Sequence, residues 1–152
     1  MIRKILVPLD GSELAGKALD LALDQAQKYS AEIVLLSVVP PLMIPTTLEP
    51  TIGGAIVSPG IILGIEEAAE VYHKRVLSEA LKRSKKSKPR VKVSSKLAKG
   101  NVADRILETA KEGEFDMIIM GSHGLSGFKK FLLGSVSNQV VHKSPCPVLI
   151  VK

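Results

Sequence analysis

Short runs of consecutive apolar residues, separated by stretches with helical spacing, constrain the fold of this chain more than any other feature. Four of the runs are continuously apolar, which is typical of strands buried on both faces of a parallel sheet. A fifth run alternates apolar and polar residues and suits a strand at the edge of a sheet. Strands that alternate with helices form a parallel sheet with right-handed crossovers. The five predicted strands are residues 5–7, 33–36, 91–97, 117–120 and 148–151.

Four predicted helices lie between these strands. Ser12 and Asn101 are good N-caps, because their side-chain oxygens accept hydrogen bonds from the first free N–H groups of a helix. Gly113 is a suitable stop for the helix that Asn101 begins, and Pro145 ends the last helix. The predicted helices span residues 12–30, 65–83, 101–113 and 135–142. The sequence therefore predicts an α/β fold with helices on both faces of the sheet.

The size of the chain favours one domain over residues 1–152. A chain of 152 residues and 16.3 kDa buries about two-thirds of its unfolded surface, so its core needs no disulfide or structural metal. The single cysteine, Cys146, cannot pair within the chain, which is typical of a reducing compartment. No apolar run approaches 18 residues, and only a short apolar run follows Arg3 and Lys4. We therefore expect a cytoplasmic protein without a signal peptide or a membrane span.

One connection breaks the regular alternation. Residues 39–64 contain five of the nine prolines and four of the twelve glycines. Their apolar residues argue against a simple solvent-exposed linker, and long connections in compact domains are usually functional or disordered. The composition leaves three readings of this variable connection open: a mobile flap, an arm that contacts a partner, and plain disorder.

A cluster of basic residues accounts for most of the net charge of +6. Nucleic acid is one conceivable partner of such a cluster, but no aromatic residue lies within it to stack on bases. A solvated helix end, followed by an edge strand that lysines protect from pairing, explains the cluster more simply. We therefore expect no specific nucleic-acid binding. The members of the cluster are Lys82, Arg83, Lys85, Lys86, Lys88, Arg90, Lys92, Lys96 and Lys99.

Glycine and serine residues are concentrated after the fourth predicted strand. Gly121 and Gly124 follow the end of this strand, and Gly134 and Ser135 open the last helix. Ligands of open parallel sheets bind beyond the carboxyl ends of the strands. Glycines there let backbone N–H groups approach an anion, the start of a helix offers free N–H groups and a positive dipole end, and Ser135 and Ser137 add hydroxyl donors. A tight turn with a helix cap is the purely structural alternative, but the glycines and serines together favour phosphate binding.

At these residues the chain resembles the universal stress protein family. The resemblance covers nearly the whole chain and rests on three segments: residues 5–12 (Ile-Leu-Val-Pro-Leu-Asp-Gly-Ser), the Gly-x2-Gly-x9-Gly-Ser pattern that begins at Gly121, and residues 146–149 (Cys-Pro-Val-Leu). The middle pattern is specific, because it separates the nucleotide-binding branch of the family from the branch that lacks it. The resemblance implies a five-stranded parallel sheet of order 3-2-1-4-5, a homodimer, and ATP in a cleft above the first and fourth strands.

The resemblance also implies roles for individual residues. Asp10 would hold ribose hydroxyls or a phosphate-bound Mg²⁺ or Mn²⁺ ion, and Pro8 and Val38 would flank the adenine of ATP, ADP or AMP. The last strand, residues 148–151, would pair across the two-fold axis of the dimer. The resemblance does not identify a further protein partner. The loop after the fourth strand and the start of the last helix would hold ribose and phosphates. Met120, at the end of the fourth strand, belongs to the same site. The two segments contribute Gly121, Ser122, His123, Gly124, Leu125, Ser126, Gly127, Gly134, Ser135, Val136 and Ser137.

The expected function is therefore that of a nucleotide-binding regulatory or stress-response module with slow ATP hydrolysis at most. A nucleotide-dependent enzyme, an ATPase or a nucleotidyl hydrolase, is the alternative. The P-loop pattern Gly-x4-Gly-Lys-Ser/Thr is absent, and no glutamate or histidine is clearly placed to activate a water. Ser122 beside His123 suggests a hydrolase pair, but adjacent residues rarely face each other as nucleophile and base. His73 and His142 are predicted to lie on helix surfaces.

Overall fold

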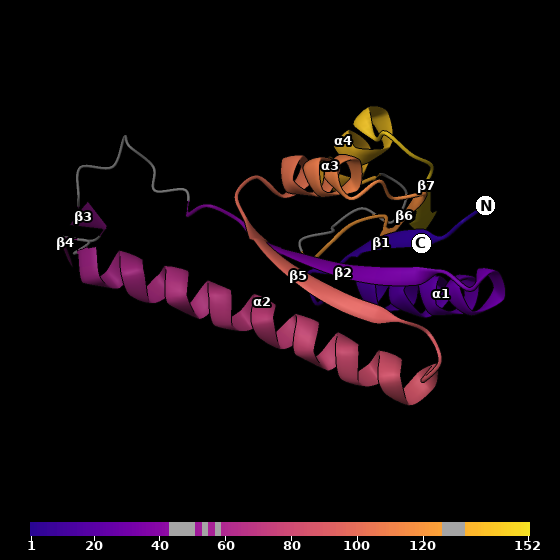
Figure 1. Cartoon of the computed structure of the whole chain (residues 1–152). Coiled ribbons are helices and arrows are strands. Elements are labelled where there is room, and N and C mark those ends of the chain that lie inside the picture. The colour runs from indigo at the N-terminus through magenta and orange to yellow at the C-terminus, as the bar shows by residue number, and fades with distance from the viewer. Residues whose placement is uncertain (43–50, 53–54, 57–58, 126–132) are drawn as a thin grey trace.

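The computed structural model of the chain describes residues 1–42, 51–52, 55–56, 59–125 and 133–152. Its centre is a parallel sheet whose strands lie in the order β5-β2-β1-β6-β7 (Figure 1). Counted along the chain, these five strands have the order 3-2-1-4-5, so the predicted fold class is confirmed. The strands are β1 (Lys4–Pro8), β2 (Glu32–Val39), β5 (Val93–Lys99), β6 (Met117–Gly121) and β7 (Val148–Val151).

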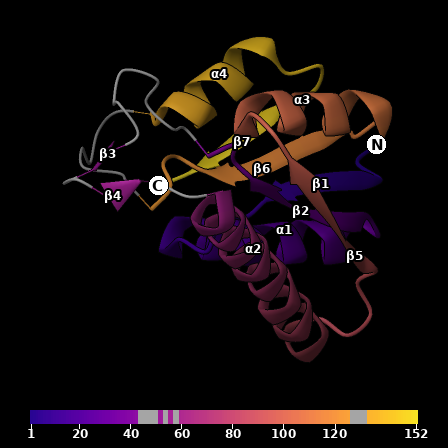
Figure 2. The same ribbon diagram turned by 90° about the vertical axis from the view of Figure 1, so that its left-hand side faces the viewer.

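Helices cover both faces of the sheet (Figures 1 and 2). α1 (Glu13–Tyr29) and α2 (Pro59–Ser87) lie on one face, and α3 (Val102–Glu112) and α4 (Ser135–Lys143) lie on the other. The central strand β1 contributes to both cores. Ile5 and Val7 pack with α1, Leu6 packs with α3, and all three side chains are fully buried. A continuously apolar run is what such a strand requires, because side chains on either face are excluded from water.

Ser12 and Asn101 begin α1 and α3 as predicted. The Ser12 hydroxyl accepts a hydrogen bond of 3.2 Å from the Ala15 N–H, and the Asn101 side-chain oxygen accepts one of 3.1 Å from the Asp104 N–H. These caps satisfy N–H groups that have no partner inside a helix. They therefore fix where each helix starts after the strand that precedes it.

α2 is longer than the sequence predicts. It has 29 residues and begins at Pro59, whereas the helical spacing predicts residues 65–83. Proline fits the first turn of a helix because the N–H that it lacks has no partner there. Gly60 and Gly64 weaken the helical signal in the sequence. The first turns of α2 extend beyond the sheet (Figure 1), where Ile61 and Leu63 are exposed.

The variable connection of residues 39–64 is described only in part. β3 (Thr51–Ile52) and β4 (Ala55–Ile56) form a short antiparallel pair that the sequence does not predict. Residues 43–50, 53–54 and 57–58 lie outside the described residues. The predicted mobility or partner contact of this connection therefore stays a prediction.

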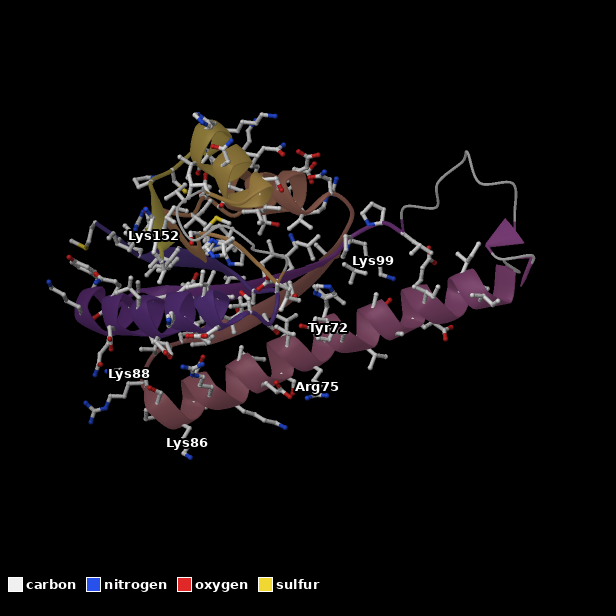
Figure 3. The ribbon with its side chains drawn as sticks, turned by 180° about the vertical axis from the view of Figure 1, so that it is seen from behind. Tyr72, Arg75, Lys86, Lys88, Lys99 and Lys152 are labelled. Atoms are coloured by element: carbon white, nitrogen blue, oxygen red, sulfur yellow. The ribbon has the colours of Figure 1, made fainter. Side chains whose placement is uncertain are left out.

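The basic cluster of residues 82–99 spans the C-terminal end of α2, the connection that follows it, and β5. Acidic residues of neighbouring elements neutralise part of it, and Figure 3 shows the Lys86 side chain at the far end of α2. This arrangement fits a solvated helix end beside an edge strand. The ion pairs of the cluster are Arg83 with Asp20, Lys88 with Asp24, Lys92 with Glu32, and Lys99 with Glu70.

No helix in the described part of the chain is both long and apolar enough to cross a membrane.

Candidate functional site

A cavity of about 410 Å³ lies where β1, β2 and β6 end. The carboxyl ends of parallel strands meet at one edge of the sheet. Between β1 and β6 this edge opens, because β1 leads into α1 on one face while β6 leads toward α4 on the other. One side of the cavity is apolar and includes Pro8, Val38 and Ile106, and the other side is formed by the loops after β1 and β6. The cavity therefore offers an apolar surface and a polar surface to the same ligand.

The Asp10 carboxylate joins these two loops. One of its oxygens accepts a hydrogen bond of 2.9 Å from the Ser12 N–H, and the other accepts one of 3.2 Å from the Leu125 N–H. A carboxylate has about four lone-pair positions, so both oxygens can accept further hydrogen bonds or bind a cation. Asp10 thus has a structural role in the loops and keeps acceptor capacity toward the cavity.

The glycines after β6 serve two different purposes. A Cβ added at Gly124 would collide with the Asp10 carboxylate, so only glycine allows the loop to approach Asp10 this closely. A Cβ added at Gly121 would lie 2.9 Å from the Leu14 Cβ, so this glycine permits close packing of α1 on β6. Gly124 therefore belongs to the polar wall of the cavity, whereas Gly121 is also explained by packing.

The N-terminus of α4 lies at the cavity, where Ser135 and Val136 form part of the wall. Gly134 is the N-cap residue, and no side chain caps this helix. The first N–H groups of a helix have no intrahelical partner and carry the positive end of the helix dipole. An uncapped helix start of this kind favours an anion as its partner.

The Ser137 hydroxyl is used differently from the way the sequence predicts. It is buried and donates to the Ser122 carbonyl (2.5 Å), with the Gly134 carbonyl as a second acceptor at 3.0 Å. Because a hydroxyl has one hydrogen, this donor is occupied within the protein. Ser137 therefore holds the loop against the helix, and the Ser135 hydroxyl, which is exposed, stays available to a ligand.

Ser122 and His123 contact each other, although adjacent residues rarely face each other. The Ser122 Oγ lies 3.0 Å from the His123 Nδ1. However, Ser122 is only 2% exposed and is not part of the cavity wall, whereas His123 is. A nucleophile must reach its substrate, so the pair does not form a hydrolytic site.

α2 adds two residues to the cavity that the sequence analysis missed. Tyr72 and His73 both line it, although the sequence places His73 on a helix surface. Figure 3 shows Tyr72 on the side of α2 that faces the sheet, with Arg75 on the opposite side. Burial lowers the pKa of His73, and the negative charge of Asp10 partly opposes this shift. The sequence gives no local signal that Tyr72 and His73 line the cavity, because both residues follow a proline-rich connection.

Most of the predicted site residues line the cavity. Ser122 lies behind the wall, and Ser126 and Gly127 lie outside the described residues. Among the residues that the structure describes, no group of three or more histidine, cysteine, aspartate or glutamate side chains could hold a metal ion. The predicted residues that line the cavity are Pro8, Asp10, Val38, Met120, Gly121, His123, Gly124, Leu125, Gly134, Ser135, Val136 and Ser137.

Comparison with known proteins finds similarity over the whole chain. The model of the universal stress protein family matches residues 1–152. Universal stress protein YxiE of Bacillus subtilis is 36% identical over 157 residues, with 100% of both chains covered.

Solved structures of the same family share the fold. Universal stress protein UspA from Lactobacillus plantarum superimposes with a TM-score of 0.81 at 23% identity, over 99% of this chain and 97% of that chain. A universal stress protein solved in complex with cAMP superimposes with a TM-score of 0.68 at 26% identity, over 99% of this chain and 97% of that chain.

Proposed function

Because the chain belongs to the universal stress protein family, we propose that it is a regulatory module of a stress response that binds an adenine nucleotide. The observation that carries the proposal is the cavity at the ends of β1 and β6, with an apolar wall beside an uncapped helix start. A relative of 26% identity was solved with cAMP, which is itself an adenine nucleotide.

The lining residues fit the parts of such a ligand. Pro8 and Val38 offer apolar surface to an adenine ring, and the backbone of Val38 would contact the edge of that ring. The α4 N-terminus, with the Ser135 hydroxyl and the Gly124 loop, would hold phosphates through N–H and O–H donors. Asp10 would accept hydrogen bonds from ribose hydroxyls or share a Mg²⁺ or Mn²⁺ ion with the phosphates. We propose ATP, ADP or AMP as the ligand.

The proposed output is a change of conformation or partner, with slow ATP hydrolysis at most. The ionisable side chains that line the described cavity are Asp10, Tyr72, His73 and His123. Both Asp10 oxygens already accept backbone hydrogen bonds, and His123 contacts Ser122. A nucleotide-dependent enzyme remains the second candidate, because a general base needs only hydrogen-bond reach of a water.

We further propose a homodimer that pairs β7 of one chain with β7 of a second. β7 is an edge strand of the sheet, and its Leu149 side chain is 38% exposed. An unpaired apolar edge strand invites pairing with another chain. Pairing of this kind would extend the sheet across a two-fold axis.

Two measurements test the nucleotide proposal. Mass spectrometry of the small molecules released on denaturation identifies a co-purified ligand, and calorimetric titration with AMP, ADP and ATP, with and without Mg²⁺, measures affinity. We expect micromolar or tighter binding of at least one of them. Failure of all three to bind would overturn the proposal. Incubation of Mg-ATP with the protein for hours separates the two candidate functions: intact ATP supports the regulatory module, and many turnovers per hour, absent from a Gly124→Val preparation, support the enzyme.

A further inference from the structure

β2 carries a buried serine, Ser37. The Ser37 side chain is fully buried, and its Oγ lies 2.7 Å from the Leu9 carbonyl oxygen and 2.8 Å from the His73 Nδ1. The hydroxyl has one hydrogen to donate to these two neighbours. The direction of that hydrogen decides which nitrogen of His73 is protonated.

The carbonyl takes the hydroxyl hydrogen. If the hydroxyl donated to His73 instead, two oxygen atoms would lie 2.7 Å apart with no hydrogen between them, and the Leu9 carbonyl would lose its donor in a buried position. The His73 Nδ1 must therefore carry a hydrogen and donate it to Ser37. In the neutral ring, the lone pair is then at Nε2.

The ring is held in place from a second side. The Tyr72 ring packs edge-on against His73 with 5.3 Å between the ring centroids, and the Tyr72 hydroxyl donates to the Asp10 carbonyl. The Nε2 atom makes no hydrogen bond to any described residue, and it is not buried. A fixed acceptor is thus left accessible on a side chain that lines the cavity.

The surroundings of the ring favour its neutral form. Burial disfavours the imidazolium, and among the described residues the Asp10 carboxylate, from the loop after β1, is the charge that opposes the effect of burial. The other ionisable side chains that line the cavity within the described residues are Tyr72 and His123. A neutral Nε2 needs a hydrogen-bond donor, and phosphate oxygens offer none. The donors of an adenine nucleotide are its ribose hydroxyls and the amino group of its base.

We propose that His73 is a ligand-recognition residue, whose Nε2 accepts a hydrogen bond from a hydroxyl or amino group on the nucleoside half of the bound nucleotide. Ser37 is then a positioning residue, because it sets which ring nitrogen is free without touching the ligand. This inference rests on the proposed function. It adds that recognition of the nucleoside depends on α2, on the opposite face of the sheet from α4.

Calorimetric titration at pH 7.5 tests this with four ligands: AMP, 2′-deoxy-AMP, 3′-deoxy-AMP and IMP, which has a carbonyl in place of the amino group. His73→Asn places an amide nitrogen near Nδ1 and has no atom at Nε2, whereas His73→Gln reaches the Nε2 position with an amide oxygen. His142→Asn, at an exposed position on α4, is the matched control.

We expect His73→Asn to weaken AMP binding by about 2- to 12-fold, the size of one net hydrogen bond. The parent should bind one of the three analogues more weakly by a similar factor, and His73→Asn should bind that analogue as well as it binds AMP. The analogue that behaves in this way identifies the hydroxyl or the amino group as the donor. His73→Gln should recover part of the loss, and His142→Asn should match the parent.

An equal loss for all four ligands, or no loss at all, would show that His73 is structural and would overturn the inference while the proposed function stands. Failure of the parent to bind AMP, ADP and ATP would overturn both; if the parent binds only ADP or ATP, the matching analogues of that nucleotide replace those of AMP. The parent protein labelled with ¹⁵N-histidine gives a test without substitutions. The free protein should show protonated Nδ1 and unprotonated Nε2 for His73, and AMP should move the Nε2 resonance upfield as it accepts a hydrogen bond; a protonated Nε2 in the free protein would contradict the tautomer.

Discussion

The hydroxyl of Tyr72 donates a hydrogen bond of 3.0 Å to the main-chain carbonyl of Asp10, so α2 is tied to the loop that ends β1. The neighbouring residue of that loop, Gly11, has a φ of +87°, which side chains rarely adopt. A Cβ at Gly11 would also collide with the Tyr72 hydroxyl. Backbone conformation and close packing therefore both require glycine here.

We expect Gly11→Ala to lower the free energy of unfolding by about 1–3 kcal/mol, because alanine is strained at positive φ. Urea denaturation measures this change. Gly64→Ala is the matched control, since a Cβ there meets no atom within 4 Å and alanine favours a helix by about 0.5–1 kcal/mol over glycine. Equal stability of Gly11→Ala and the parent would mean that the loop rearranges freely, and that Tyr72 does not hold it.

The stability of the protein should depend on the protonation of His73. Its pKa in the folded state is lowered by burial below the ordinary value of 6.5, so the native state binds fewer protons than the unfolded state. The corresponding stability is fully present above pH 6.5 and is lost as the pH falls through the lowered pKa. The unfolding free energy of the parent, relative to that of His73→Gln, should therefore fall as the pH is lowered from 7.5 to 5. The parent and His142→Gln provide the comparison for an exposed histidine, and a rise in the relative stability of the parent over His73→Gln in acid would contradict the sign.

The basic cluster of residues 82–99 should not bind a defined nucleic-acid sequence. Part of its charge is already paired with acidic residues of α1, β2 and α2. Fluorescence anisotropy with oligonucleotides of different sequence should show only weak binding that falls steeply with added salt. Submicromolar affinity for one sequence at about 150 mM salt, above the affinity for a scrambled sequence, would mean that the cluster is a specific site.

The sequence predicts well those structural features that residues close together in the chain determine. The buried run of β1 and the caps at Ser12 and Asn101 follow from short-range patterns, and the structure has them where they are predicted. The His73 position in the cavity depends instead on how α2, which follows the variable connection, packs on β2 and β5, and no local pattern encodes this packing. The hydrogen bonds of the Ser137 hydroxyl are likewise not encoded by a local pattern, because the fold of the loop positions its two carbonyl acceptors.

The proposed dimer predicts a strong effect of charge at the sheet edge. Leu149→Lys would place a lysine on β7 in each chain, so a two-fold interface would lose the burial of two leucines. We expect the dissociation constant to rise about 100-fold or more. Val141→Lys is a matched control, because Val141 is 40% exposed on α4 and Leu149 is 38% exposed. Sedimentation velocity should show a dimer for the parent and for Val141→Lys. A monomeric parent at tens of micromolar would end the dimer proposal.

The polar wall of the cavity predicts how the protein responds to Mg-ATP. At a ligand concentration about 100 times the dissociation constant, binding stabilises the native state by about 2.7 kcal/mol. For a domain of this size, this corresponds to a rise in Tm of about 5–11 °C. Gly124→Val should lose most of this rise, because its side chain would displace the Asp10 carboxylate and occupy space beside the phosphates. Gly124 does not adopt a positive φ, so the loss comes from the size of the valine side chain and not from backbone strain.

The same substitution at an open position separates the loss of the site from a general effect of valine. Gly64→Val adds its side chain where a Cβ meets no other atom, and it should keep the full rise in Tm with Mg-ATP. Ser135→Ala should keep part of the rise, because it removes one hydroxyl donor to a charged group, worth about 1.5–3 kcal/mol of binding. Circular dichroism should show that all three variants fold without ligand. If Gly124→Val gains the same Tm as the parent, phosphates do not lie beside Gly124 and the nucleotide binds elsewhere on the protein.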